Sequence, residues 1–120
     1  MSRVELHGGP YRYYIGPTDQ GDPYGYGKLF TDKLAYEGDV HRSGYQHGMG
    51  TRYVEGARLI GRFKFGTFID GKKVFDNGKV QEGLFNNKAQ IVEGVSYQDA
   101  KKFEGTYVDG EEAEGVWIVQ

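Results

Sequence analysis

Hydrophobic side chains recur in this chain on both sides of regularly spaced glycines. Five of these glycines lie 22 or 23 residues apart, at Gly16, Gly38, Gly61, Gly83 and Gly105. The residues two positions before and two positions after each glycine are mostly aromatic or aliphatic. Such alternation predicts a β-strand with one buried face, on which the glycine allows a neighbouring strand or ring to approach closely.

Each predicted strand is followed, at a fixed distance, by residues that favour tight turns. About five residues after the glycines come Gly21, Ser43-Gly44, Gly66, Asn86-Asn87 and Asp109-Gly110. A second apolar stretch then opens with further glycines, and a second turn leads to the next copy. The unit of strand, turn, strand and turn predicts an all-β, elongated antiparallel meander of stacked β-hairpins with about ten short strands.

The repeat spans the chain as a single domain of residues 1–120. Residues 1–11 are expected to form an N-terminal cap, the repeats begin near residues 14, 36, 59, 81 and 103, and residues 116–119 are expected to cover the last edge. A competing register exists, because the sequence of residues 66–71 resembles that of residues 105–110. We place the third copy at Gly61, since Gly56 and Gly78 then fall where turns are expected.

Composition narrows the class of protein further. The 120 residues include 20 glycines, 10 tyrosines and 7 phenylalanines but only 3 prolines, which argues against a disordered glycine-rich linker. The absence of cysteine excludes disulfides and a cysteine nucleophile. No apolar run approaches the ~20 residues of a membrane span, and residues 1–7 lack the apolar core of a signal peptide. We therefore expect a cytoplasmic protein.

The copies resemble the MORN repeat, whose pattern is roughly Tyr-x-Gly-x-Trp, a turn, Gly-x-Gly and a loop ending in Asp-Gly. The clearest copy is Tyr36-Glu37-Gly38-Asp39-Val40 followed by His47-Gly48-Met49-Gly50-Thr51, and Phe103-Glu104-Gly105 with Asp109-Gly110 is another. The copies at Gly61 and Gly83 are degenerate: Leu59 and Gln81 stand where the pattern has tyrosine. The resemblance implies a non-enzymatic module that holds protein partners, located peripherally to membranes or the cytoskeleton, and a lipid-binding role has been suggested for the family.

Candidate catalytic and metal-binding residues are accounted for by the repeat. The Gly-x-Gly pairs lack the lysine and the following helix of a phosphate loop. His41 and His47 could face each other across a hairpin, with Asp39 as the nearby carboxylate, but a histidine at position 47 fits the MORN pattern. The acidic run 111–114 is predicted to be a solvated loop. We expect no catalytic residues, no cofactor, no metal and no enzymatic activity.

Three kinds of partner are compatible with the chain. An aromatic-lined face is predicted to bind another protein, through Tyr24, Tyr26, Tyr45, Tyr53, Arg52, Arg58, Arg62 and Lys64. The alternatives are peripheral binding to anionic, phosphoinositide-type membranes through the basic stretch 52–79, and a role as accessory or regulatory subunit of an enzyme. A net charge of −2 argues against nucleic acid.

The ends of the array suggest contacts between copies. Residues 1–80 carry 12 basic and 9 acidic side chains, whereas residues 81–120 carry 3 and 8, which favours head-to-tail contacts. Open strand edges also permit an end-to-end homodimer.

Overall fold

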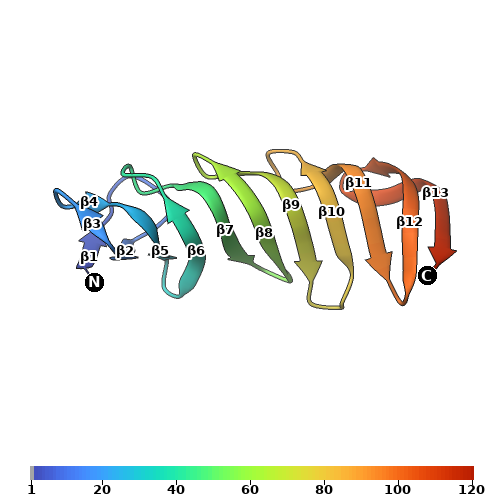
Figure 1. The fold of residues 1–120 in the computed structure, drawn as a ribbon, viewed down its shortest axis with the longest axis horizontal. Helices are drawn as coiled ribbons and strands as arrows, with labels where there is room; N and C mark the ends of the chain where they lie inside the picture. The colour runs from blue at the N-terminus through green and yellow to red at the C-terminus, as the bar shows by residue number, and fades with distance from the viewer. Residues whose placement is uncertain (1) are drawn as a thin grey trace.

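The computed structural model describes residues 2–120 as one open antiparallel sheet of 11 strands with a small two-stranded hairpin beside it (Figure 1). The main sheet contains β1 (Ser2–Glu5), β2 (Tyr13–Gly16), β5 (Gly25–Phe30), β6 (Leu34–Val40), β7 (Gln46–Val54), β8 (Ala57–Lys64), β9 (Thr67–Phe75), β10 (Val80–Phe85), β11 (Ile91–Gln98), β12 (Lys101–Val108) and β13 (Glu111–Val119). The side hairpin is β3 (Thr18–Asp19) and β4 (Asp22–Pro23). The strands of the main sheet follow one another in sequence order, so the predicted all-β hairpin meander is confirmed.

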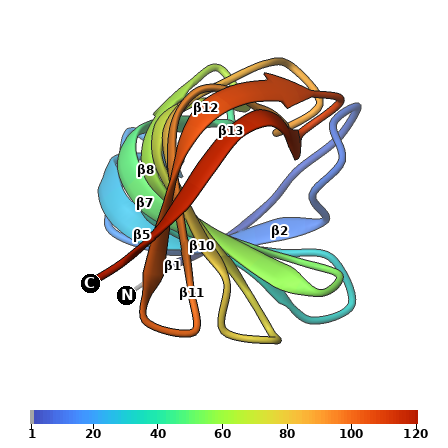
Figure 2. The same cartoon turned by 90° about the vertical axis from the view of Figure 1, so that its right-hand side faces the viewer.

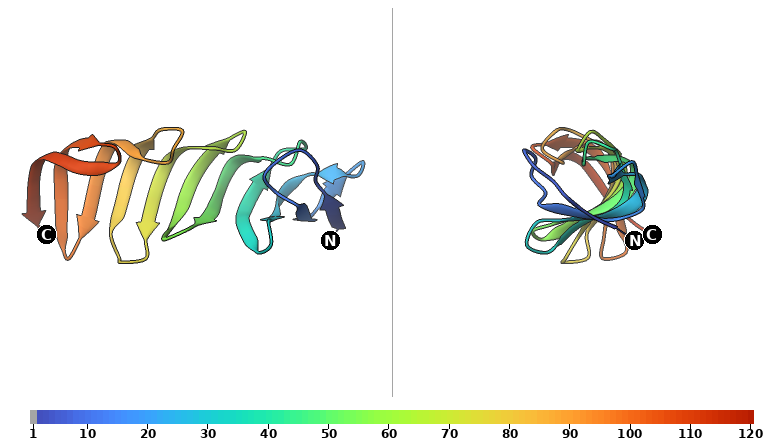
Figure 3. Two further views of the ribbon diagram at one scale, coloured as in Figure 1. Left: turned by 180° about the vertical axis from the view of Figure 1, so that it is seen from behind. Right: turned by 90° about the vertical axis from the view of Figure 1, so that its left-hand side faces the viewer.

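The sheet is long and strongly curled. Its principal extents are 52 × 20 × 20 Å, and the two termini lie at opposite ends. Seen along the long axis, the strands wrap into a trough, and the turns on one side fold over its opening (Figure 2). The views from behind and from the other end show the same curl along the whole array (Figure 3).

A continuous row of glycines runs across the sheet. The register places Gly38 opposite Gly27 and Gly50, and it places Gly61 opposite Gly50 and Gly71. The row continues through Gly83, Gly94, Gly105 and Gly115. The five glycines that lie 22 or 23 residues apart in the sequence are therefore every second member of one row. The other members are the glycines of the strands between them.

The close approach of the strands requires the missing side chains. At Gly61, where φ is +155°, an added Cβ would lie 2.1 Å from the carbonyl oxygen of Asp70. No real Cβ tolerates that distance, so only glycine permits the curl at this point. The same geometry decides the register of the third copy: Gly61 is in the row, whereas Gly66 lies in the turn between β8 and β9.

β-Bulges recur in phase with the glycines. Four register shifts lie shortly beyond a glycine pair, after Gly38, at Phe63, at Phe85 and after Gly105. A fifth, between Leu29 and Phe30, lies at the other end of the β5–β6 hairpin. A bulge bends its strand and increases the local twist. The repeated bulges therefore turn one end of each hairpin over the trough.

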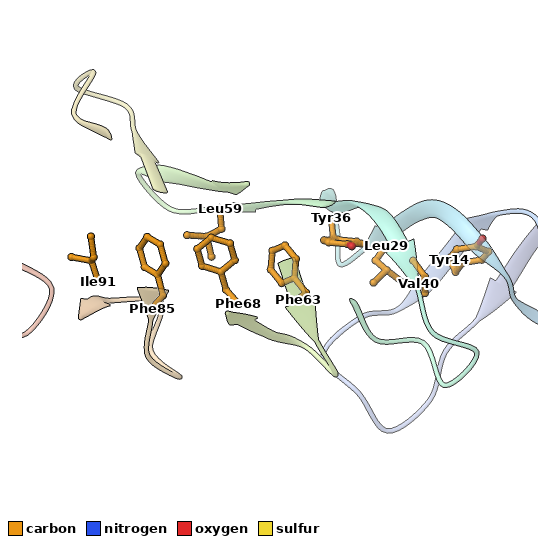
Figure 4. Packing of buried hydrophobic residues seen from close by; sticks show 9 residues of the cluster. All are labelled: Tyr14, Leu29, Tyr36, Val40, Leu59, Phe63, Phe68, Phe85 and Ile91. Carbon is orange, nitrogen blue, oxygen red and sulfur yellow. The ribbon is translucent and has the colours of Figure 1, made fainter. Parts of the chain in front are cut away.

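The trough is filled by its own side chains. The core residues Tyr14, Leu29, Tyr36, Val40, Leu59, Phe63, Phe68, Phe85 and Ile91 lie in single file along the long axis (Figure 4). The Tyr36 ring covers the glycine row: a Cβ at Gly50 would lie 2.2 Å from its hydroxyl oxygen. That hydroxyl donates a 2.8 Å hydrogen bond to the carbonyl oxygen of Asp39, which satisfies its buried polar group.

The inward row two positions from the glycines has aromatic side chains at both ends of the array and several polar ones between them. Cross-strand pairs link Tyr14, Leu29, Tyr36, Arg52, Leu59, Lys73, Gln81, Ser96, Phe103 and Trp117 in one line. Gln81 and Ser96 are buried, and both donate to the carboxylate of Glu112, at 2.9 and 2.6 Å. Lys79 adds an ion pair at 3.2 Å.

This network corrects one expectation from the sequence. Residues 111–114 are the start of β13 rather than a solvated loop, and Glu112 points inward because the bulge after Gly105 places it opposite Tyr107. In the degenerate copy at Gly83, Gln81 stands in place of the tyrosine and donates the hydrogen bond that holds Glu112.

The two ends of the sheet differ. The expected cap at residues 1–11 includes residue 1, which lies outside the described residues. Within the rest of it, β1 pairs with β2, and the following segment brings Leu6 against Gly44. At the other end the expectation was wrong: residues 116–119 do not cover an edge, because β13 is itself the exposed edge strand.

Candidate partner-binding surface

Most aromatic side chains that face the trough form the core and are not accessible to a partner. Tyr14, Tyr36 and Phe63 are buried there, with Phe63 edge-on to Tyr36 at 5.3 Å between ring centroids. The aromatic side chains available for contact therefore lie on the outer face of the sheet and in the turns.

The outer face carries one cluster of exposed apolar side chains on β5 and β7, which we call the outer patch: Tyr26, Met49 and Tyr53. Their exposed fractions are 62%, 59% and 38%. β6 lies between the two strands and contributes two carboxylates to the outer patch. Tyr26 is paired with Asp39, whose Oδ2 accepts a 3.0 Å hydrogen bond from the Met49 amide.

The second carboxylate of β6 fixes the third member of the outer patch. The Tyr53 hydroxyl donates a 3.1 Å hydrogen bond to Oε1 of Glu37. Partial burial raises the pKa of the Tyr53 hydroxyl, and its bond to Glu37 raises the pKa further because the carboxylate opposes a phenolate. The hydroxyl therefore stays protonated, and the ring is held against β6.

Arginines border the outer patch on β8. Arg58 is paired with Tyr53, and Arg62 is paired with Met49. Arg62 also forms a 2.6 Å ion pair with Asp70, so part of its charge is compensated. Apolar rings beside arginines on an exposed sheet are a composition found at protein interfaces.

Of the eight residues predicted from the sequence, the structure thus brings together Tyr26, Tyr53, Arg58 and Arg62. Tyr24 is exposed in the connection between β4 and β5. Lys64 is exposed at the end of β8. Tyr45 is half-buried in the turn after β6, where a Cβ at Gly9 would lie 3.3 Å from its hydroxyl oxygen.

Arg52 differs from the other predicted contacts because it faces the trough. Its guanidinium lies 5.2 Å from the centroid of Phe63, and its Nη2 donates to the carbonyl of Gly66. Lys73 also faces inward and donates a 3.0 Å hydrogen bond to the carbonyl of Ala89, while Lys79 is paired with Glu112. The basic stretch 52–79 is therefore divided between the two faces of the sheet.

The two histidines at the turn between β6 and β7 lie close together, in line with the facing arrangement that the sequence allowed. The ring centroids of His41 and His47 are 5.6 Å apart, and Phe65 packs on His47 at 4.4 Å. Phe65 is exposed in the turn between β8 and β9.

Both histidines use Nδ1 as an acceptor. The Ser43 amide lies 3.1 Å from Nδ1 of His41, and the Phe65 amide lies 3.2 Å from Nδ1 of His47. A neutral ring that accepts at Nδ1 carries its hydrogen on Nε2 and retains no lone pair for a metal. Among residues 2–120, no group of three His, Cys, Asp or Glu side chains could hold a metal ion.

Two of the open surface pockets in the described part of the chain are larger than about 500 Å³. One of about 610 Å³ is near the N-terminal segment, where Arg3 is paired with Glu5 and Arg12 with Asp32. The other, of about 560 Å³, lies at the ends of β7–β9 and is lined by His47, Gly48, Arg62, Phe63, Lys64 and Ile69. The second pocket adjoins the outer patch through Arg62.

No helix in the described part of the chain is long and apolar enough to cross a membrane. In comparisons with models of known protein families and with curated protein sequences, the chain matches none.

Proposed function

We propose that this chain is a non-enzymatic protein-interaction module of the MORN-repeat type, and that it binds a partner protein through the outer patch. The observation that carries the proposal is the convergence of Tyr26, Met49 and Tyr53 on one exposed face beside two arginines. Aromatic and methionine side chains bury large areas at little entropic cost, and arginine adds polar contacts.

The MORN assignment is supported by the glycine row. A repeat with one glycine per strand at a constant cross-strand register matches the Gly positions of the resemblance, and Tyr36 over Gly38 and Gly50 gives the aromatic position a structural role. The two degenerate copies keep the glycine, but Leu59 and Gln81 replace the tyrosine.

Protein binding is preferred to the membrane alternative because the basic stretch does not form one face. Only Arg58, Arg62, Lys64 and Lys72 of that stretch are exposed on its outer side, and both Arg62 and Lys72 are paired with carboxylates. Flotation with vesicles of anionic lipid at low and moderate salt distinguishes protein binding from membrane binding. Salt-sensitive co-flotation would favour the membrane alternative over the proposal.

An enzymatic or enzyme-accessory role lacks an observation in its favour. Ser96 is the serine with the most polar surroundings, since Tyr107 lies 2.9 Å from it, but it is fully buried and lines none of the pockets described above.

The test of the proposal is affinity capture with quantitative mass spectrometry from extracts of the organism that encodes the chain. The informative variant is Tyr26→Ser combined with Tyr53→Ser, because both rings are exposed and their loss leaves the core intact. Leu84→Ser, an exposed substitution on β10, is the matched control. A protein retained by the wild type and the control, and reduced at least about tenfold by the double variant, supports the proposal, since tenfold corresponds to only about 1.4 kcal/mol of binding free energy. Equal retention by all three contradicts it.

A further inference from the structure

The pocket of about 560 Å³ at the ends of β7–β9 has the size of a ligand site, and its lining includes the apolar side chains Phe63 and Ile69. Ile69 belongs to this lining because of a β-bulge. Arg62 is paired with Asp70. Phe63 is paired with Phe68, so Ile69 is left as the extra residue of β9. A bulge redirects a side chain out of the regular alternation, and this one supplies a wall for an apolar group.

Basic side chains border the same pocket, and none of its lining residues is acidic. Arg62 uses Nη2 for its 2.6 Å contact with Asp70, and the other N–H groups of its guanidinium remain for a ligand. Lys64 is exposed and forms no ion pair in the part of the chain that the structure describes. An anionic group beside these two side chains is therefore electrostatically favoured.

Two carboxylates near the pocket are already engaged within the chain. Asp70 is paired with Arg62, and Asp39 accepts a backbone amide at 3.0 Å. The ring of His47, which lines the pocket, accepts the Phe65 amide at Nδ1. A neutral ring of this kind carries its hydrogen on Nε2 and adds one more donor. The pocket thus combines apolar walls with N–H donors.

Phe65 follows Lys64 in an unusual backbone conformation. Its φ is +44°, in the left-handed region that a bulky residue rarely adopts. The other non-glycine residues with positive φ in residues 2–120 are small or polar: Gln20, Ala89, Asp99, Ala100 and Asp109. The Phe65 ring packs on His47 at 4.4 Å and is nevertheless 54% exposed. A strained residue at an exposed position beside a pocket is typical of a binding site.

We propose that this pocket binds an acidic segment of the partner protein, with an apolar side chain of the segment in the pocket and an adjacent carboxylate on Lys64 and Arg62. Phe65 packs against the apolar side chain from the rim. The inference rests on the proposed function, because the pocket adjoins the outer patch through Arg62 and extends the same surface. Charge complementarity selects this occupant, since a basic segment would meet Lys64 and Arg62 with like charge.

The first test is selection from a random peptide library displayed on phage, with the 120-residue chain as the immobilised target. Selected peptides should carry an apolar residue next to a carboxylate, and their binding should weaken as the salt concentration rises. The same selection on Lys64→Glu should lose the preference for acidic residues. Enrichment of peptides without carboxylates, or no enrichment on the wild type, overturns the proposal.

A selected acidic peptide, made synthetically, is then titrated against variants of the chain. Lys64→Glu should weaken its binding at least about tenfold, because two carboxylates then face each other. Lys88→Glu makes the same charge reversal at an exposed position in the turn between β10 and β11, and it should leave the affinity unchanged. Equal affinities of the two variants for the peptide overturn the proposal.

Phe65→Asn distinguishes a binding role of the ring from a structural one. Asparagine tolerates positive φ, so thermal stability should be unchanged or higher. Loss of the exposed ring should nevertheless weaken the acidic peptide several-fold, because an aromatic contact is removed. A less stable variant that binds the peptide as tightly as the wild type would mean that Phe65 supports the fold instead.

Lys64→Glu also belongs in the affinity-capture experiment. A partner that is lost with the Tyr26→Ser and Tyr53→Ser double variant but retained by Lys64→Glu would leave the proposed function standing and overturn this inference. Equal retention of every protein by the wild type and the double variant counts against the proposed function. The peptide selection still reports on the pocket in that case, because it does not require the native partner.

Discussion

The hydroxyl of Ser96 donates a 2.6 Å hydrogen bond to the carboxylate of Glu112, although the two residues are 16 positions apart and β12 lies between their strands. The contact crosses the inside of the curled sheet. Gln81 and Lys79 reach the same carboxylate from β10 and the turn before it. Glu112 thus connects strands that no cross-strand pairing joins.

The first prediction concerns the pH dependence of stability. Burial raises the pKa of Glu112, but hydrogen bonds from Ser96 and Gln81 and the contact with Lys79 together lower the pKa below its usual value. Because the folded-state pKa lies below the unfolded value of about 4.3, the stabilisation is present above about pH 5 and is lost as the pH falls through the folded-state pKa. Urea unfolding between pH 7 and 3 should show a smaller loss on acidification for Glu112→Gln than for the wild type. Glu93→Gln, exposed on β11, is the control, and an unchanged slope for Glu112→Gln would contradict the prediction.

The second prediction concerns the donor that replaces the repeat tyrosine. Gln81→Leu removes two hydrogen bonds from a buried site and leaves Glu112 short of a donor, so we expect a loss of about 1–3 kcal/mol in the free energy of unfolding. Adding Glu112→Leu should restore part of the loss, because the buried charge is removed with its donor. A double-mutant cycle measured by chemical denaturation gives the coupling. Strict additivity of the two changes would count against the network.

A third prediction compares two glycines with positive φ. Gly61→Ala places a Cβ 2.1 Å from the Asp70 carbonyl oxygen, and we expect it to cost about 3 kcal/mol or more. Gly56, at φ +77°, has nothing within 4 Å of the added carbon, so Gly56→Ala should cost only the backbone strain of about 1 kcal/mol. Thermal unfolding of both variants measures the difference. Similar losses would mean that backbone conformation, rather than contact between the strands, requires glycine in the row.

The fourth prediction concerns the outer patch. Glu37→Gln removes the carboxylate that opposes a Tyr53 phenolate, so the pKa of Tyr53 should fall towards the ordinary tyrosine value of about 10. Because burial also raises this pKa and remains in the variant, the fall should be partial. NMR titration of the Tyr53 ring in both proteins measures it, with Tyr24 as an internal reference. Stability near neutral pH should change by less than about 0.5 kcal/mol, as for most exposed substitutions. An unchanged pKa of Tyr53 would contradict the prediction, because it would mean that the Glu37 carboxylate does not hold the Tyr53 ring.

Much of the fold was predictable because it depends on short-range pattern. Alternation around Gly16, Gly38 and Gly105 predicted strands, and turn residues at constant spacing predicted hairpins and their order. The position of the third copy could be predicted from Gly56 and Gly78. For the candidate site, sequence reasoning identified Tyr26, Tyr53, Arg58 and Arg62 as individual contacts but assigned Arg52 to the same face.

By itself, the sequence determined the period, the strands and the turns of this protein, because a strand's alternation and a turn's glycine are local properties of the chain. The tertiary structure decided how the copies are aligned. Cross-strand register brings the glycines of both strands of every hairpin into one row, and the bulge after Gly105 turns Glu112 inward to meet Gln81 and Ser96. Register and bulges are set by backbone pairing between segments, and a bulge reverses which face the following residues occupy. That reversal is invisible in the alternation of a single strand.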